Sequence, residues 1–381
     1  MTRTEPAVKR TDYSEGTATR SQLPAENRRK DLLRRYTPTP YGVDLPVTAK
    51  AVRLESNCPT VVESALGFFA RHQGQSPGHP EFLWRIVSQE DHEMDEAGVA
   101  LSAFSDRGLR FANIGQRSFL AVDLEAREGI GFVADRLVER EPKLNCRSLF
   151  DTLFCMTAAS LGIVPLSAAC VGMGERGLLI FGPPNSGKTT ASYLAAKHGL
   201  EFHADQAVFF EMEGGRLRVW GDFLPAIFRP ESLQFLPELR TSTRRFSYPG
   251  LTVHYLPKRP FQADKAHPVS PVCCVFLERE GATFPSLSRI TRIDLSRRLA
   301  ESMLFKDYDA IAQSGGMVFS ALEKLPAYHL SYGSDPASVA TLIRNMVTDY
   351  EFLEDWVQKK YLNEAGDRKE ILIPSRLADQ S

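Results

Sequence analysis

The chain has 381 residues, with 46 basic and 47 acidic side chains and a formal net charge of −1. This balance leaves no surplus of positive charge for a nucleic-acid-binding face, and a hydrophobic content of 43% excludes disorder along the whole chain. At about 150 residues per domain, the length predicts two or three domains.

The sequence predicts a soluble, cytoplasmic protein that has neither a membrane nor a nucleic acid as its partner. No apolar run approaches the roughly 20 residues needed to cross a bilayer, and no apolar stretch follows the first charges as in an export signal. The six cysteines lack both Cys-x-x-Cys spacing and the density of a disulfide scaffold, so we expect reduced, buried thiols. They are Cys58, Cys146, Cys155, Cys170, Cys273 and Cys274.

Residues 1–36 are polar and carry nine Arg or Lys against five Asp or Glu, which predicts a disordered basic arm. Such an arm can bind phosphates or a partner, but no aromatic residues interleave with its charges, so a solvated tail is the simpler interpretation.

Residues 37–145 have the pattern of a small β-rich α+β domain. Apolar spacing predicts a short helix at 60–70, and short apolar runs at 82–87, 99–104, 109–114 and 118–124 predict an antiparallel meander. Between the first two runs lies an acidic turn around His92 (Glu90, Asp91, Glu93, Asp95, Glu96), which we interpret as solvated rather than as a metal site.

A second domain is predicted over 146–350, followed by a C-terminal helix and tail over 351–381. Its first helix is expected at 148–161, with Ser148 and Asp151 as an N-terminal capping pair and Gly162 as a left-handed stop.

The sharpest motif in the chain is the P-loop pattern G-x-x-x-x-G-K-[ST]. Its residues are Gly182, Pro183, Pro184, Asn185, Ser186, Gly187, Lys188 and Thr189. An apolar strand at 177–181 precedes it, and a helix at 190–197, beginning with Thr190 and closed by Gly199, follows it.

These residue types suit a bound nucleoside triphosphate. Gly182 and Gly187 let the backbone bend so that successive N–H groups and a helix N-terminus face an anion. Lys188 is expected to reach the β- and γ-phosphates of ATP, and the Thr189 hydroxyl to ligate Mg²⁺. Residues 182–190 are therefore the predicted cofactor-binding residues, and Thr189 is the predicted metal ligand.

The segments beside the loop are unusual for P-loop proteins. Residues 164–171 form a predicted strand, and a turn at 172–176 connects it directly to the strand at 177–181. The strand before the P-loop is thus the second strand of a hairpin, whereas most P-loop proteins reach that strand by a parallel crossover. Downstream, Asp205 precedes a second predicted hairpin, at 207–212 and 216–220.

At this point the sequence resembles the HPr kinase/phosphorylase group, whose P-loop lies in a fold shared with phosphoenolpyruvate carboxykinase. The similarity covers about 148–345, and its specific part covers about 164–212. The family pattern of a strand, hairpin, P-loop, helix, glycine and Ala-Asp-Asp appears here with Gly199 and with Ala204-Asp205-Gln206. The resemblance implies an α/β, phosphoenolpyruvate carboxykinase-like P-loop domain with a mixed sheet, and runs at 272–278 and 328–332 fit its later strands.

The resemblance implies a kinase that transfers the γ-phosphoryl group of ATP to a serine hydroxyl of a protein or small molecule. Asp205 then occupies the position of the catalytic base and acts together with Lys188. The sequence departs from the family at Gln206, where the family has a second Asp, and at Ser167, where it has His. His203, two residues before Asp205, is a hypothetical replacement for that imidazole, although a structural role is the simpler interpretation. Arg229 is a further candidate for phosphate contact, against an ordinary surface role.

Two other functions stay open. The departures at Gln206 and Ser167 suit a nucleotide-binding module with little turnover, in which ATP occupancy controls a partner contact of the first domain. A conventional P-loop ATPase would use Glu278, at the end of the 272–278 strand, to polarise water, but no Asp precedes it. Residues 241–265 are expected to form a variable loop over the site, and the family resemblance suggests a homo-oligomer.

Overall fold

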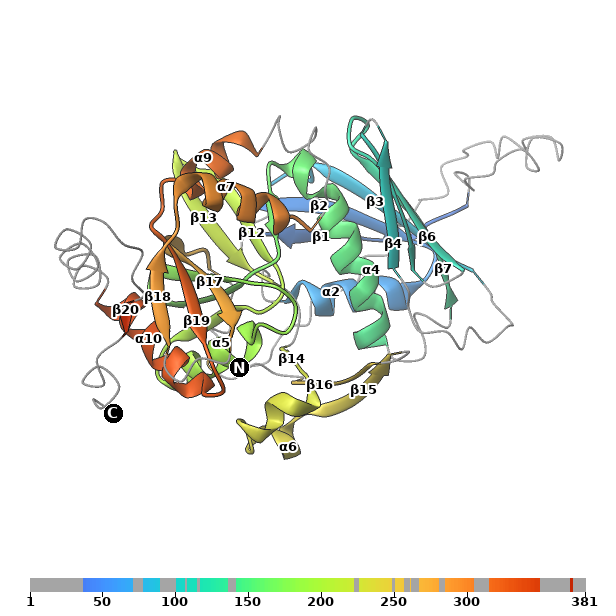
Figure 1. The fold of residues 1–381 in the computed structure, drawn as a ribbon. Helices are drawn as coiled ribbons and strands as arrows, with labels where there is room; N and C mark the ends of the chain where they lie inside the picture. The colour runs from blue at the N-terminus through green and yellow to red at the C-terminus, as the bar shows by residue number, and fades with distance from the viewer. Residues whose placement is uncertain are drawn as a thin grey trace, which may run out of the picture. The chain divides into compact units, whose positions relative to one another are not determined.

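The computed structural model describes residues 37–70, 78–89, 101–106, 108–114, 117–135, 142–222, 226–248, 251–256, 261, 267–280, 285–304, 315–349 and 371–372. The basic arm, the acidic turn around His92, and almost all of 351–381 lie outside these residues, as does part of the 241–265 segment. The chain divides into two compact units, Met1–Leu161 and Gly162–Ser381. Both are mixed α/β (Figure 1).

The described strands of the first unit form a seven-stranded sheet in the order β1-β2-β3-β7-β6-β5-β4. They are β1 (Tyr41–Val47), β2 (Lys50–Ser56), β3 (Phe82–Gln89), β4 (Leu101–Asp106), β5 (Leu109–Ile114), β6 (Ser118–Asp123) and β7 (Glu128–Ala134). Strands β4 to β6 confirm the antiparallel pairing predicted for the last three runs, and β7, which was not predicted, extends this meander. Strand β3 does not join it as expected, because it lies parallel to both β2 and β7.

Two helices, α2 (Pro59–Phe68) and α4 (Pro142–Thr157), pack together in the first unit. Helix α2 confirms the predicted helix and buries Val61, Val62 and Ala65. Helix α4 starts six residues before the expected Ser148, at a proline, which suits a first turn because that position needs no N–H donor. It continues as a 3₁₀ turn, η2 (Ala158–Leu161), and ends before Gly162, whose φ is +73°. Thus α4 lies in the first unit, whereas the sequence analysis assigned it to the second domain.

The central sheet of the second unit has the described order β11-β9-β10-β17-β19-β18-β20. Its members are β9 (Ala169–Met173), β10 (Arg176–Phe181), β11 (Glu201–Ala204), β17 (Ser270–Arg279), β18 (Ser286–Arg289), β19 (Ala327–Tyr332) and β20 (Ile371–Leu372). Strands β9 and β10 form the predicted antiparallel hairpin, while β10, β17 and β19 run parallel. The sheet is therefore mixed, as expected.

The predicted strand at 164–171 is wrong as a single element. It breaks into β8 (Val164–Leu166) and β9, and β8 joins a separate sheet with β12 (Val208–Glu213) and β13 (Arg216–Gly221). The break lies at Ser167, whose N–H donates to the carbonyl of Ser302 at 2.7 Å. The backbone N–H of Ser167 thus bonds to a residue far along the chain and not to a neighbouring strand, which interrupts the strand at this point. Strands β12 and β13 confirm the second predicted hairpin.

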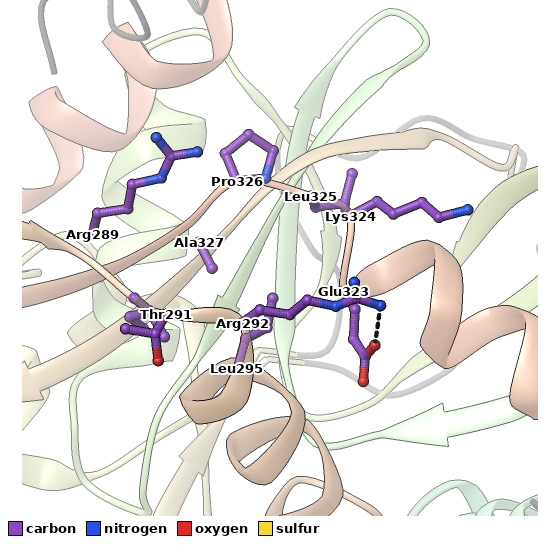
Figure 2. A pocket seen from close by; sticks show the side chains of 10 residues that line it. Arg289, Thr291, Arg292, Leu295, Glu323, Lys324, Leu325, Pro326 and Ala327 are labelled. Atoms are coloured by element: carbon purple, nitrogen blue, oxygen red, sulfur yellow. Dashed lines mark hydrogen bonds and ion pairs between the residues drawn. The ribbon is translucent and has the colours of Figure 1, made fainter. Parts of the chain in front are cut away.

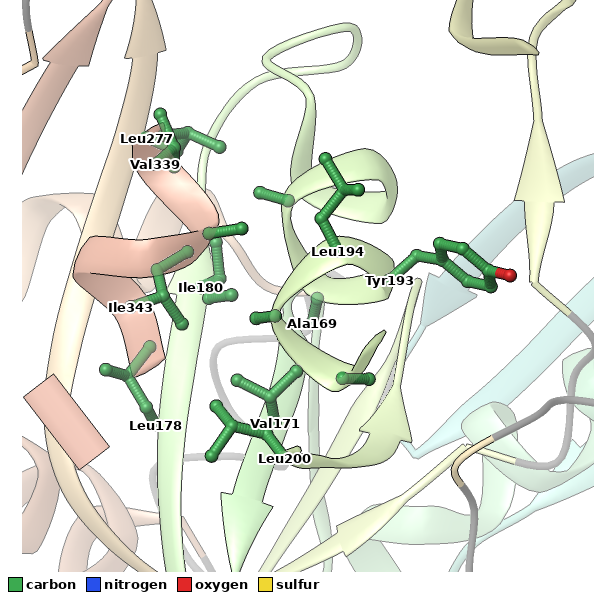
Figure 3. Close-up of a cluster of buried hydrophobic side chains, with 14 of the residues drawn as sticks. Ala169, Val171, Leu178, Ile180, Tyr193, Leu194, Leu200, Leu277, Val339 and Ile343 are labelled. Atoms are coloured by element: carbon green, nitrogen blue, oxygen red, sulfur yellow. The ribbon is translucent and has the colours of Figure 1, made fainter. Parts of the chain in front are cut away.

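Helices α5 (Lys188–Lys197) and α10 (Pro336–Thr348) cover one face of the central sheet (Figure 3). Leu178 and Ile180 of β10 point toward these helices, and they share one buried cluster with Leu194 of α5 and Ile343 of α10. A second apolar core on the other face includes residues of α7 (Arg292–Glu301) and α9 (Gly316–Leu322). Burial on both faces explains why β10 and β17 are nearly continuous apolar runs.

Smaller elements complete the second unit: β14 (Ile227–Phe228), η3 (Pro230–Gln234), α6 (Leu239–Ser242), β15 (Arg244–Tyr248) and β16 (Leu251–Tyr255). Within the described part of the chain, no helix combines the length and apolarity needed to cross a membrane. Five cysteine side chains are described, and all five are free thiols, four of them buried. Among these five, the expected burial is wrong for Cys58, which is partly exposed; the side chain of Cys146 lies outside the description.

Candidate nucleotide-binding site

The P-loop motif lies where β10 ends and α5 begins, in the predicted order of strand, loop and helix. The carboxyl ends of the parallel strands β10, β17 and β19 meet at this edge of the sheet. In open α/β sheets, ligands bind outside the carboxyl ends of the strands. The motif therefore lies at the edge where a ligand is expected.

Both motif glycines are required by the local geometry. Gly182 has a φ of +149°, and a Cβ there would lie 2.5 Å from the carbonyl oxygen of Leu277 in β17. Gly187 has a φ of +89°, and a Cβ there would lie 2.1 Å from Oη of Tyr332 in β19. A side chain at Gly182 would displace the backbone of β17, and one at Gly187 would displace the Tyr332 side chain.

Tyr332 also holds the loop directly, because its hydroxyl donates a buried hydrogen bond of 2.9 Å to the carbonyl of Ser186. Inside the loop, the N–H of Ser186 donates to the carbonyl of Pro183 at 3.2 Å, and Asn185 has a left-handed φ of +71°. The sequence analysis did not identify Tyr332 as a site residue. No local pattern marks it, because its partner lies 146 residues earlier in the chain.

The side chain of Lys188 curls back over the loop. Its Nζ donates to the main-chain carbonyls of Gly182 at 2.7 Å and Pro183 at 3.1 Å. Burial lowers the pKa of this ammonium group, and the negative charge of Asp205 opposes that lowering. The structure therefore brings Lys188 within electrostatic range of Asp205.

The other motif side chains differ in exposure. Pro183, Pro184 and Asn185 are exposed, Thr189 is partly buried in the first turn of α5, and Thr190 is buried. Ser186 is 3% exposed, and among the described residues its Oγ has no hydrogen-bond partner. A buried, unsatisfied hydroxyl in a loop of this kind is suited to a polar ligand.

Asp205 directly follows β11 and is buried, with Oδ2 accepting the N–H of Ile227 at 3.2 Å. A second buried carboxylate, Asp222, holds the turn that carries it. Asp222 Oδ2 accepts the N–H groups of Asp205 at 2.9 Å, Gln206 at 3.0 Å and Ala207 at 3.5 Å. The sequence analysis missed Asp222, although its place just beyond the predicted strand at 216–220 was an available signal.

The other candidates are less closely tied to the loop. Arg229 is exposed at the start of η3. His203 lies within β11, and its Nε2 is 3.6 Å from Oε2 of Glu201, an acidic partner that the sequence analysis did not consider. Glu278 is exposed, and its Oε2 lies 2.9 Å from Nε2 of His329.

A hollow of about 520 Å³ lies at the amino end of β19, between β18, α7 and α9 (Figure 2). Its described lining is partly basic, with Arg289, Arg292 and Lys324, but Arg292 is paired with Glu323 at 3.1 Å. The lining includes none of residues 182–190. The hollow is thus separate from the P-loop, which leaves the carboxyl end of β10.

No family model matches the sequence, and no curated protein matches it. Among solved structures, the chain is similar to the Hpr(Ser) kinase/phosphatase from Coxiella burnetii, at 13% identity and a TM-score of 0.26. The match covers 53% of this chain and 99% of that chain.

Proposed function

We propose that this chain is a phosphotransferase that binds ATP on residues 182–190 and transfers the γ-phosphoryl group to a serine hydroxyl of a protein or small molecule. The observation that carries the proposal is the P-loop motif in its strand–loop–helix setting, with Lys188 on the loop and the buried carboxylate of Asp205 within electrostatic range of it. A phosphate-binding cation and a candidate base thus share one edge of the sheet.

The residues of the loop fit a triphosphate. Lys188 Nζ is held by two main-chain carbonyls that a phosphate oxygen can replace as partner, and Ser186 Oγ is buried without a hydrogen bond from the described residues. Thr189, in the first turn of α5, is the residue that would hold Mg²⁺. When bound, the ion neutralises charge between the β- and γ-phosphates.

In this proposal Asp205 accepts the proton of the attacking serine hydroxyl. Asp222 positions it by fixing the N–H groups of the turn 205–207. Phosphoryl transfer depends mainly on positioning and charge stabilisation, so one well-held carboxylate, Lys188 and Mg²⁺ form a minimal catalytic set. The hairpin that feeds the loop and the mixed sheet further support a phosphoenolpyruvate carboxykinase-like fold of the HPr kinase group.

The proposal is tested by incubating the purified chain with γ-labelled ATP, Mg²⁺ and a soluble extract. We expect label on a serine of an acceptor, loss of ATP binding in Lys188→Ala, and loss of transfer with retained binding in Asp205→Asn. Lys197→Ala is the matched control, because this lysine ends the same helix and its Nζ forms an exposed ion pair with Glu238. Unchanged ATP affinity in Lys188→Ala would overturn the proposal.

A second function, a nucleotide-binding module with little turnover, is favoured by Gln206. This residue stands where the resemblance places a second acid, so a carboxylate that helps to hold Mg²⁺ is missing. ATP binding without labelled acceptor or free phosphate would support the module. Release of free phosphate alone would support an ATPase.

A further inference from the structure

A cluster of two imidazoles and one carboxylate lies at the start of β11, in the second unit. Its members are Glu201, His203 and His267, whose nearest ligand atoms all lie within 4.8 Å of one another. Neither the P-loop nor the proposed catalysis uses them. We propose that these three residues form a binding site for a transition-metal cation, and that the cation is Zn²⁺.

The distances suit a tetrahedral ion. Glu201 Oε2 lies 3.3 Å from His267 Nε2 and 3.6 Å from His203 Nε2. Ligand atoms that surround a tetrahedral Zn²⁺ at about 2.0–2.1 Å are about 3.3–3.4 Å apart. The carboxylate oxygen and the two ring nitrogens thus already have nearly the spacing of three corners of that tetrahedron.

The surroundings of the carboxylate point to a ligand rather than to hydrogen bonds. Glu201 Oε2 is buried, and it accepts no hydrogen bond from the residues that the structure describes, although two imidazole nitrogens are near. The rings of His203 and His267 lie edge to face with centroids 5.2 Å apart. A cation between them would be ligated by this oxygen and by one nitrogen of each ring.

The backbone holds the ligands in place. Glu201 and His203 are two residues apart on β11, where a register irregularity between Phe202 and Ala204 interrupts the regular alternation, and Glu201 Oε2 lies 3.6 Å from His203 Nε2. Opposite Glu201 in β9 is Gly172, where a Cβ would lie 3.0 Å from His203 Nε2. His267 comes two residues before Val269, whose N–H and carbonyl both pair with Val219. The ion therefore ties β11 to the segment that enters β17.

The donor set selects the metal. Two imidazoles and one carboxylate are the ligands of many three-residue zinc sites, which keep a fourth position for water. Mg²⁺ and Ca²⁺ prefer oxygen ligands alone. His203 is 4% exposed, whereas the other two side chains are about two-fifths exposed, so an ion can enter from solvent.

The test is a titration of the full chain, stripped with a chelator, with Zn²⁺ by calorimetry, with Co²⁺ as a spectroscopic probe. We expect one Zn²⁺ per chain and the visible bands of tetrahedral Co²⁺. Glu201→Gln and His267→Ala should each lower the Zn²⁺ affinity by at least about 100-fold, since loss of mere second-shell partners costs about 10–100-fold. Both side chains are partly exposed, so these variants should fold, and Glu201→Gln keeps the side-chain shape.

The controls separate this site from the P-loop. His198→Ala removes an exposed imidazole of the same unit, and it should bind Zn²⁺ like the parent, as should Lys188→Ala. Zn²⁺ binding that is unaffected in both Glu201→Gln and His267→Ala, no stoichiometric binding by the parent, or an equal affinity for Ca²⁺ would each overturn the proposal.

Discussion

Replacement of Gly187 by alanine tests how closely β19 holds the P-loop. The residue has a φ of +89°, and an added Cβ would lie 2.1 Å from Tyr332 Oη. The left-handed backbone costs a residue with a Cβ about 1–2 kcal/mol, and overpacking costs about 1–3 kcal/mol. We therefore expect Gly187→Ala to lower the free energy of local unfolding by about 2–5 kcal/mol.

A second substitution, at Tyr332, separates the cost of the left-handed backbone from the cost of the steric contact. Tyr332→Phe alone leaves the buried carbonyl of Ser186 without its 2.9 Å donor, at a cost of about 1–3 kcal/mol. In the double variant the Oη that would meet the Cβ is gone, and the nearest remaining ring atom, Cζ, lies 3.3 Å away. The double variant should thus lose about 1–3 kcal/mol less than the sum of the single variants.

Amide hydrogen exchange read by mass spectrometry measures this cycle, through the opening free energies of β10 and α5. Peptides of β5 and β6 in the first unit are the internal control and should not change. If the two substitutions add within about 0.5 kcal/mol, the steric contact between Gly187 and Tyr332 does not exist as described.

Asp222, Lys188 and Arg110 are polar side chains that lie at least partly inside the protein. Asp222→Ala removes the acceptor of the backbone donors at 205–207 and should cost about 3–6 kcal/mol in urea unfolding, with a smaller loss in Asp222→Asn. Burial lowers the pKa of Lys188, so between this lowered pKa and the unfolded pKa of about 10.4 the unfolded state binds more protons than the folded state. Stability should then rise as the pH rises toward that value. Melting temperatures measured at several pH values should show this rise in the parent chain and a smaller rise in Lys188→Met. Arg110→Ala removes a buried donor to the carbonyls of Met156 at 2.6 Å and Cys155 at 3.5 Å, and should cost the first unit about 2–4 kcal/mol in thermal unfolding; an unchanged melting temperature would contradict this.

Features that depend on neighbours in sequence could be predicted. The P-loop, the strand before it and the helix after it are local patterns, and β5 (Leu109–Ile114) has the predicted bounds. The hairpin of β9 and β10 followed from a short polar turn between two apolar runs. In each case a pattern of residue types within a short stretch of the chain indicates the type of element.

Features that depend on distant partners could not be predicted. The parallel pairing of β3 with β2 and β7 leaves no trace in the alternation of β3 itself, because alternation reports only which side chains are buried. The break at Ser167 depends on the carbonyl of Ser302, far along the chain. The clustering of His267 with Glu201 is likewise a tertiary event, and neither residue lies in a recognisable metal motif.

The same distinction applies to the P-loop. Its sequence accounts for the residue types, but its conformation is also fixed by strands that arrive much later in the chain: Gly182 lies against the carbonyl of Leu277, and Gly187 lies against Tyr332. Both contacts exist only when β17 and β19 are paired in their observed register, because the end of β10 faces Phe276 and the end of β19 faces Arg279. Nucleotide affinity should therefore respond to changes in β17 and β19 that touch no phosphate, and Tyr332→Phe should weaken ATP binding through the loop alone.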